Sequence, residues 1–462
     1  MASYCEGSSR KLKFISEYFA KPTRVANNET QNYLGALELH MLSMGPMQKG
    51  LLYNTKPHNL QSHLLPKLKK SLYVSLLHFY PLAGQLVTRK FEDENKCSFY
   101  VDCNKGPGAR LIHASVDYTV SDICSSVDVH PIVNSFFDLG EKSVNYDGHT
   151  KPLLSVQVTE LVDGVFIGFT MNHCIADGTS LWHFISSLAE IFGQLNDDNQ
   201  DNDKISVSKK PIFTRLFPEP GYDKICKLPP FEPEKDLFRY DPGPLRVRLF
   251  HFSSRAISML KAQANEEYGH HNNISSFQAL CGLTWRSITR ARNLQSDLDV
   301  DCTVIMNART RLNPPLPYEY FKSFLWGGRT GSKVSDLLGK PGLGRAALLI
   351  NQSIKMQDEK IIREMSKLAD EYPRFAQPGP RSLNYRPHRL YIGGSTKFEM
   401  YGPEFGLGKA VAVLAGHANK EDGKVTANPG RNGDGSVDLE ICLEPETMNA
   451  LELEEEFMSF AS

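Results

Sequence analysis

The chain has 462 residues, of which 41% are hydrophobic and 23% charged, so it is long enough and apolar enough for two globular domains. Its 52 Lys and Arg nearly balance its 53 Asp and Glu, which gives no electrostatic reason to expect nucleic acid or an anionic membrane as the main partner. The nine cysteines are scattered, without the C-x-x-C spacing of a zinc or redox site, and this favours reduced thiols in a cytoplasmic protein without a metal.

The N-terminal half alternates between helical and strand-like patterns. Residues 1–10 are polar and no apolar run approaches the roughly 18 residues of a membrane span, so we expect no signal peptide and no membrane association. Six leucines form a helical stripe over residues 64–78, which ends at the Pro and Gly of 80–84. Apolar segments at 153–161 and 165–171 are typical of strands. The alternation predicts a mixed α/β fold.

Two segments of unusual composition separate the halves of the chain. Residues 196–203 contain no apolar side chain, and a proline-rich stretch without periodic apolar positions follows. Such composition favours an interdomain connection. We therefore predict an N-terminal domain over residues 1–195, a crossover loop over 196–241 and a C-terminal domain over 242–462.

The second half begins with a strand-like pattern at residues 246–252. A helix is predicted from Ser275, because Gln278 stands three residues later in a capping-box pattern. The polar, Gly-rich residues 419–435 are interpreted as a loop joining two strands.

The strongest chemical signal follows the strand pattern at 165–171. That strand leads into His173, a short turn and then Asp177, after which apolar residues repeat at helical spacing. A histidine is largely neutral at pH 7, which suits a general base, and the aspartate could orient its ring or hold the turn. The plain structural alternative is a core histidine and an aspartate that caps the helix.

Ordered motifs along the chain resemble those of one enzyme family. Residues 173–178 resemble its H-x-x-x-D-G signature, and Met-Gln-Lys-Gly at 47–50 resembles a segment near its start. Phe-Tyr-Pro-Leu-Ala-Gly at 79–84, Asn-Ala-Arg-Thr-Arg at 307–311 and Glu-Phe-Gly-Leu-Gly at 404–408 resemble three more. The chain is therefore similar, over most of its length, to the plant BAHD acyl-CoA-dependent acyltransferases.

This resemblance implies an α/β protein with the two-domain fold of chloramphenicol acetyltransferase and a solvent channel between the domains. The implied reaction transfers an acyl group from acyl-CoA to a hydroxyl or amine of a plant specialised metabolite, with His173 as general base. Acyl-CoA would be a co-substrate and no cofactor is expected. Cys174 is interpreted as a core residue, and we expect a monomer whose partners are its two small-molecule substrates.

The resemblance also implies roles for residues around the histidine. Asp177 would turn away from the substrate and pair with Arg309, and with Gly178 these residues would be structural parts of the active site. Phe405, Gly406 and Gly408 would bind CoA by shaping the backbone beside its channel.

The phosphates of CoA need cations or N–H donors, and relatives receive them mainly on the second domain. Ser254 is predicted to cap a helix whose N-terminus would favour an anion, with Lys261 on its second turn. The alternative is an ordinary capped surface helix with a solvated lysine.

Several positions depart from the family pattern. Glu404 stands where Asp is usual, and Leu407 replaces a Trp. Lys322-Ser323 replaces a Gly-Asn pair, and Gly393-Gly394-Ser395 stands where some hydroxycinnamoyl-transferring relatives carry Thr and Trp. These changes leave the acyl donor and the acceptor open. They also leave two alternatives: an elimination or cyclisation in a repurposed pocket, and a ligand-binding protein on the same fold.

Overall fold

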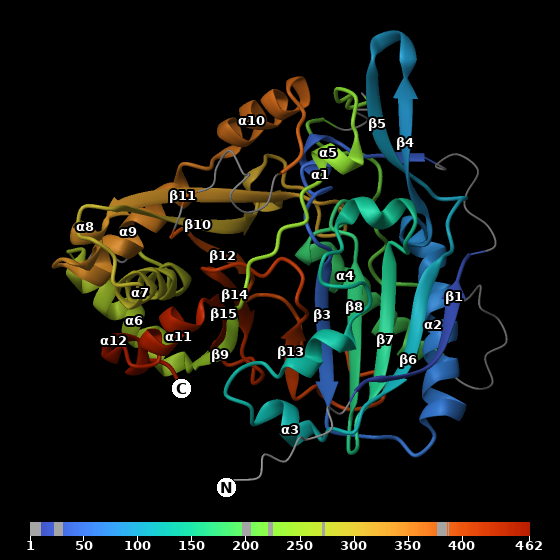
Figure 1. The fold of residues 1–462 in the computed structure, drawn as a ribbon, viewed down its shortest axis with the longest axis horizontal. Coiled ribbons are helices and arrows are strands. Elements are labelled where there is room, and N and C mark those ends of the chain that lie inside the picture. Colours follow the sequence, from blue (N-terminus) through green and yellow to red (C-terminus); the bar gives the residue numbers. More distant parts are fainter. Residues whose placement is uncertain are drawn as a thin grey trace, which may run out of the picture.

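The computed structural model describes residues 11–22, 31–195, 205–219, 225–269, 273–376, 386 and 388–462. These residues form two sheet-rich domains that lie side by side (Figure 1). Each domain contains a six-stranded sheet, and the cavity described below lies between them.

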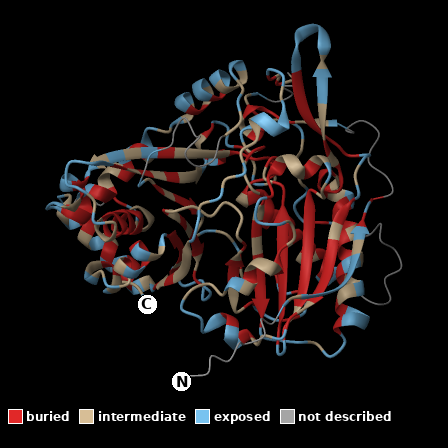
Figure 2. Ribbon diagram, viewed as in Figure 1, coloured by how far each residue is buried: buried red, intermediate tan, exposed pale blue. Residues whose placement is uncertain are grey.

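The first sheet has the strand order β1-β6-β7-β8-β3-β13. In that order its strands are Lys13–Ala20, Ala109–Ser115, Leu154–Glu160, Val165–Met171, Met47–Tyr53 and Ala412–Ala415. All pairs are antiparallel except β6 with β7. Figure 2 shows that its central strands are buried along most of their length.

Strand β8 is covered on both faces, because side chains alternate between the two faces of a sheet. Ile167 and Phe169 lie in the main core of the domain, together with residues of helices α2 (Leu65–His78) and α4 (Gly178–Gln194). Phe166 points to the other face and joins a smaller apolar cluster with Phe136. The strand therefore ends, just before His173, in rigid surroundings.

The second sheet has the strand order β11-β10-β12-β14-β15-β9. In that order its strands are Leu325–Lys333, Asp299–Asn307, Leu390–Gly394, Lys424–Pro429, Val437–Leu443 and Arg246–Phe252. Helices α6 (Ser254–Glu267), α7 (Ser276–Ala291) and α9 (Gly342–Lys355) share one apolar core with this sheet. That core holds Trp285, which is 1% exposed.

Smaller elements complete the described chain. A three-stranded sheet, ordered β2 (Gln31–Tyr33), β5 (Lys96–Asp102) and β4 (Gln85–Phe91), projects beside the first domain (Figure 1). The short helices are α1 (Ala36–Leu39), α3 (Val120–Cys124), α5 (Pro233–Asp236), α8 (Val334–Leu338), α11 (Pro445–Leu451) and α12 (Glu455–Met458). Helix α10 (Glu359–Glu371) follows α9 and lies above the second domain in the view of Figure 1.

Elements with a strong local pattern are confirmed. The leucine stripe forms α2, and the strand patterns at 153–161, 165–171 and 246–252 form β7, β8 and β9. The capping box of α7 is present: Gln278 donates its N–H to Ser275 Oγ at 3.3 Å, and Ser275 donates its N–H to Gln278 Oε1 at 2.8 Å. Most of the predicted polar crossover, 196–203, lies outside the described residues.

Two segments of the second half differ from expectation. Residues 419–435 are not a simple loop, because they contain β14, whose Val425 and Ala427 are fully buried between β12 and β15. Strand β13 pairs with β3 and so belongs to the first sheet, although the division of the chain assigned residues 242–462 to the C-terminal domain. Figure 1 shows β13 beside β3.

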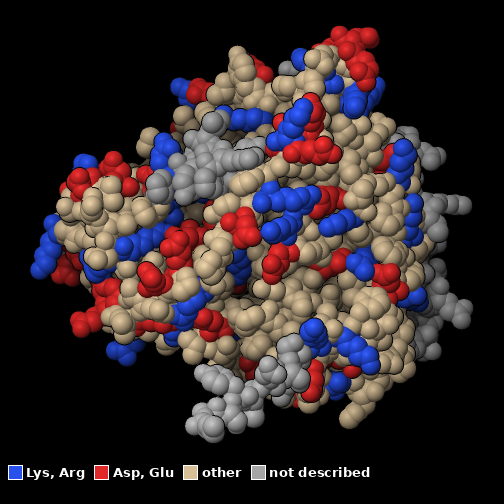
Figure 3. Space-filling model, in the orientation of Figure 1, with Lys and Arg blue, Asp and Glu red and all other residues tan. Residues whose placement is uncertain are grey.

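The surface carries both signs of charge. On the face shown in Figure 3, Lys and Arg are interspersed with Asp and Glu, in keeping with a formal net charge of −1. Among the described residues, no helix is both long enough and apolar enough to cross a bilayer.

Candidate active site

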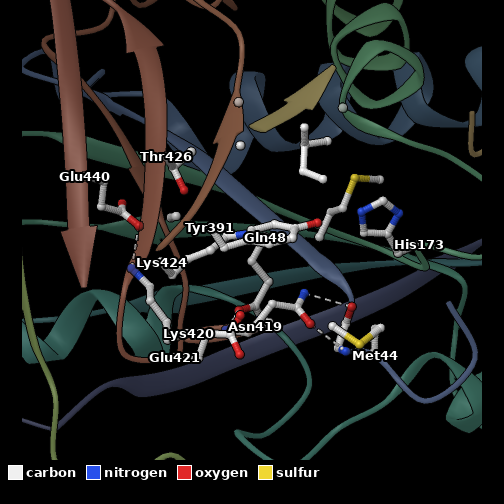
Figure 4. Close-up of a pocket in the computed structure, with 18 of the residues that line it drawn as sticks. Met44, Gln48, His173, Tyr391, Asn419, Lys420, Glu421, Lys424, Thr426 and Glu440 are labelled. Carbon is white, nitrogen blue, oxygen red and sulfur yellow. Dashed lines mark hydrogen bonds and ion pairs between the residues drawn. The ribbon is translucent and has the colours of Figure 1, made fainter. Parts of the chain in front are cut away.

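A cavity of about 1770 Å³ lies between the two domains. Its walls come from both: His173 and Trp182 from the first domain, and Met306, Tyr391 and Lys424 from the second. Pockets for one small ligand usually measure roughly 300–1,000 Å³. The cavity therefore has room for two substrates at once, and Figure 4 shows His173 on its wall.

Hydrogen bonds from a neighbouring loop hold the backbone of His173 in place. Its N–H donates to Asn145 Oδ1 at 2.7 Å, and Asn172 Nδ2 donates to the Asn145 carbonyl at 2.7 Å. Asn145 is itself fixed, because its Nδ2 donates to the Met41 carbonyl at 2.8 Å. The sequence interpretation missed Asn145, which is 28 residues from the histidine along the chain and belongs to no recognised motif.

The two nitrogens of the His173 imidazole have different surroundings. Its Nδ1 lies 2.9 Å from the Ala176 carbonyl oxygen, which can only accept, so Nδ1 carries the proton and Nε2 keeps a lone pair. The ring faces the cavity yet lies deep in the protein, and burial lowers the pKa of His173, an effect that the nearby Asp177 partly offsets. His173 is therefore neutral at pH 7, as a general base must be.

Asp177 is completely buried and is bound by three donors. Arg309 Nη1 donates to its Oδ2 at 2.6 Å, the Phe324 N–H donates to the same oxygen at 3.0 Å, and the Ser180 N–H donates to Oδ1 at 3.0 Å. Burial opposes ionisation, but Arg309 and the N–H donors outweigh it and hold the pKa of this carboxyl below its usual value. The carboxylate thus pairs with Arg309 and also caps α4.

Gly178 begins α4 and lines the cavity directly. A Cβ at this position would lie 3.3 Å from the ring of Phe398, tighter than ordinary contact. The glycine therefore lets the start of the helix pass close to Phe398, which also lines the cavity.

Lys322, one of the departures from the family motif, points away from the cavity. Its Nζ donates to Asn32 Oδ1 at 2.6 Å and lies 3.5 Å from Glu38 Oε1. Its carbonyl accepts a bond from Arg309 Nη2 at 3.0 Å, so the backbone still supports the Asp177–Arg309 pair. The substitution therefore changes a buried polar cluster and not the cavity wall.

Phe405, Gly406 and Gly408 are not among the residues that line the cavity. The Phe405 ring packs against Phe169 and Phe192 in the core of the first domain. These three residues of the motif have positive φ, between 50° and 78°, a region that glycine adopts without strain. A contribution to CoA binding stays a prediction, and it would act through the backbone of this turn.

Leu407, where relatives carry Trp, is 3% exposed and belongs to the same core. It does not line the cavity, so we expect that its neighbours fill the space that the larger ring would take.

We therefore expect Leu407→Trp to overpack this core and to lower the free energy of unfolding by roughly 1–3 kcal/mol. Thermal denaturation measures the change, and Leu407→Met is the control, because it conserves volume. An unchanged or raised melting temperature for the Trp variant would show instead that the site holds open space.

The predicted phosphate site needs one correction. The helix α6 is capped by Ser253, whose Oγ accepts the Ala256 N–H at 3.1 Å, and Ser254 is the first helical residue. The cap stands one residue earlier because Ser253 has the extended backbone that a capping residue requires. Lys261 lines the cavity, whereas Ser254 does not.

Comparisons with known proteins cover nearly the whole chain. A model of the Transferase family matches residues 11–458. An uncharacterized acetyltransferase of Arabidopsis thaliana is 32% identical over 97% of this chain and 98% of its own length. The BAHD acyltransferase DCR of the same species is 30% identical over 97% of this chain and 92% of its own length.

The fold is also that of a solved enzyme. The crystal structure of vinorine synthase matches with a TM-score of 0.72 at 19% identity, over 98% of this chain and 99% of that one. This likeness confirms the predicted α/β class with the chloramphenicol acetyltransferase fold.

Proposed function

We propose, for a chain that belongs to the BAHD acyltransferases of the Transferase family, that His173 is the general base of the reaction. The enzyme transfers an acyl group from an acyl-CoA thioester to a hydroxyl or amine. The observation that carries the proposal is the orientation of His173, whose Nδ1 is bound to the Ala176 carbonyl while Nε2 is left with a lone pair at the cavity.

The geometry supports a direct transfer. His173 Nε2 takes the proton of the acceptor hydroxyl or amine, and that oxygen or nitrogen forms a bond to the thioester carbonyl carbon. The tetrahedral intermediate collapses, the carbon–sulfur bond breaks, and the imidazolium returns its proton to the departing CoA thiolate. The Nδ1–H bond to Ala176 holds the ring through both steps and stabilises the imidazolium.

An acyl-enzyme is not needed in this scheme. Cys174 follows the histidine but is fully buried, and burial raises the pKa of its thiol well above the usual value. A thiol of this kind is a poor nucleophile. The comparisons give no support to an elimination or cyclisation in place of acyl transfer.

The reaction is tested by following free thiol. Purified protein is incubated with acetyl-, malonyl-, benzoyl- or hydroxycinnamoyl-CoA and with pools of plant phenolics, alcohols and amines. We expect thiol release that depends on the acceptor, together with a stoichiometric acylated product. Conversion of an acceptor without thiol release would contradict acyl transfer from CoA.

We also propose that the enzyme acts as a monomer in the cytoplasm on a plant specialised metabolite. In support of a reducing compartment, the cysteines of the described residues are free thiols, and all of them except Cys124 are buried.

The CoA phosphates are proposed to bind near Lys261. This lysine lies on the cavity wall, which is also lined by Ser276 and Gln278 at the N-terminal end of α7. A cation with neighbouring N–H donors is suited to a phosphate.

Charge reversal by Lys261→Glu is expected to raise KM for acyl-CoA, because a carboxylate would repel the phosphates, and to leave the acceptor KM nearly unchanged. Steady-state kinetics with each substrate varied in turn measures both constants. Lys360→Glu is the matched control, since Lys360 is an exposed lysine of α10 outside the cavity lining. If KM for acyl-CoA does not change in the Lys261 variant, Lys261 is not part of the CoA site.

A further inference from the structure

The wall of the cavity built by the second sheet carries more cations than carboxylates. Two of its cations are paired: Lys420 lies 2.5 Å from Glu440, and Arg389 lies 3.4 Å from Glu421. Lys424 of β14 also lines this wall, and Lys49, on β3 of the first sheet, lines the cavity and reaches Asn428 of β14. Among the described residues, no carboxylate oxygen lies within 4.0 Å of either ammonium, so the wall has an excess of positive charge.

Few groups around Lys424 balance the positive charge of its ammonium. Its Nζ lies 4.0 Å from the centre of the Tyr391 ring, a cation–π contact that Figure 4 shows inside the cavity. Lys49 Nζ, by comparison, donates to Asn428 Oδ1 at 3.3 Å. A desolvated ammonium without an anion is costly, and such groups in a cavity are suited to a charged ligand.

The missing side chain at position 393 leaves this ammonium open to the cavity. A Cβ on Gly393 would lie 3.7 Å from Lys424 Nζ, so a larger residue would stand directly against the charge. Gly393 is one of the departures from the family pattern. Because position 393 has no side chain, a ligand in the cavity can reach the ammonium of Lys424.

Lys424 and His173 line one cavity. The charge of Lys424 is among the causes that lower the pKa of His173, and Figure 4 shows both side chains. The pantetheine arm of CoA separates its phosphates from its thioester. Apart from those phosphates, the anions that the two substrates can bring into this cavity are carboxylates on the acyl group or on the acceptor.

We propose that Lys424, together with Lys49 of the first sheet, binds a carboxylate carried by one of the two substrates while the reacting group lies at His173. This inference rests on the proposed function for the identity of the reaction, but the binding of the carboxylate does not depend on turnover. The substrate is then either an acceptor that is a hydroxy or amino acid, or the CoA thioester of a dicarboxylic acid.

The binding itself is tested without catalysis. The probes are 4-coumarate and its methyl ester, which differ in the carboxylate charge, titrated by calorimetry into the native protein and into Lys424→Met. The native protein should bind the acid more tightly than the ester, and Lys424→Met should lose this preference, by roughly 10- to 100-fold for a charged hydrogen bond.

Two further variants keep the binding test informative. Lys142→Met is the matched control, because Lys142 also lines the cavity but pairs with Asp241 at 3.3 Å, and it should keep the preference. If Lys424→Met does not fold, Gly393→Thr tests the same site by crowding the ammonium without removing it, and it should also weaken the preference. Equal binding of acid and ester to the native protein, no binding of either, or a preference retained in these variants overturns the proposal.

Turnover distinguishes the two sources of the carboxylate. One comparison uses malonyl-CoA and acetyl-CoA with a common acceptor, and the other uses 4-hydroxyphenyllactate and its methyl ester with a common donor. Lys424→Met should lower kcat/KM selectively for the charged member of one pair, and that pair identifies the substrate concerned. An equal loss for all four, or a weaker affinity for CoA itself, would overturn the proposal while leaving acyl transfer established.

The preference should also depend on pH in a defined direction. Burial lowers the pKa of Lys424 to about 8; Glu421 opposes this shift, whereas Arg389 and Lys49 add to it. The ammonium is charged below that pH and neutral above it, so the preference for 4-coumarate over its ester should decline as the pH rises through about 8. Tyr391 and His173 face the same space, but His173 is already neutral there because its pKa is lowered.

Discussion

Replacing His173 with alanine is expected to lower kcat for acyl transfer by roughly 10²–10⁴-fold, the usual contribution of a positioned general base. The variant loses the nitrogen that accepts the acceptor's proton but keeps the backbone hydrogen bond to Asn145. The melting temperature should therefore change little. Thiol release at saturating substrates measures the loss, and His417→Ala, which removes another histidine from the cavity wall, is the matched control.

The pH dependence offers a separate check on the same residue. Because burial lowers the pKa of His173 below 6.5, the base is neutral and active above that pKa and protonated and inactive below it. The kcat/KM of the native enzyme should fall as the pH falls through a value below 6.5. Near-native turnover by the alanine variant, with an unchanged melting curve, would exclude His173 as the base.

Breaking the buried pair of Asp177 and Arg309 is expected to cost roughly 3–5 kcal/mol of unfolding free energy, because it leaves a charge without its partner in the protein interior. Asp177→Asn and Arg309→Ala each remove one side of the 2.6 Å contact. Activity should fall as well, since the pair holds the turn that carries His173. Denaturant unfolding gives the free energies, and the exposed Arg345–Asp336 pair, broken by Arg345→Met, should change them little.

The double variant tests whether the two residues act as one unit. If they do, combining Asp177→Asn with Arg309→Ala should be much less harmful than the sum of the single changes, because residues in one network couple. Additive costs would mean that Asp177 serves only as the cap of α4 through its bond to the Ser180 N–H.

Helices, strands and caps that depend on residues close together in the chain could be predicted from the sequence. The stripe of α2, the strand β8 and the capping box of α7 each depend on side chains a few positions apart. The pairing of Asp177 with Arg309 was predicted from the resemblance to the family and not from a local sequence pattern, since the two residues are 132 positions apart.

Features that depend on distant contacts could not be predicted. β14 appeared to be a loop because its two buried apolar residues, Val425 and Ala427, stand among polar neighbours. Asn145 supports His173 through tertiary hydrogen bonds alone. The exposure of Lys424 to the cavity depends on Gly393, on the neighbouring strand β12, a relation that no local spacing shows.

The pairing of β13 with β3 has a consequence for how the protein is made. Gly45 and Asn419, which flank these strands, are hydrogen-bonded although they are 374 positions apart in the chain. While the ribosome is still translating the second half, β3 is an unprotected sheet edge, and such edges invite association with other chains. The first sheet therefore cannot be completed until residue 415 has been made, and a fragment truncated before residue 412 would expose β3 as an edge strand prone to association.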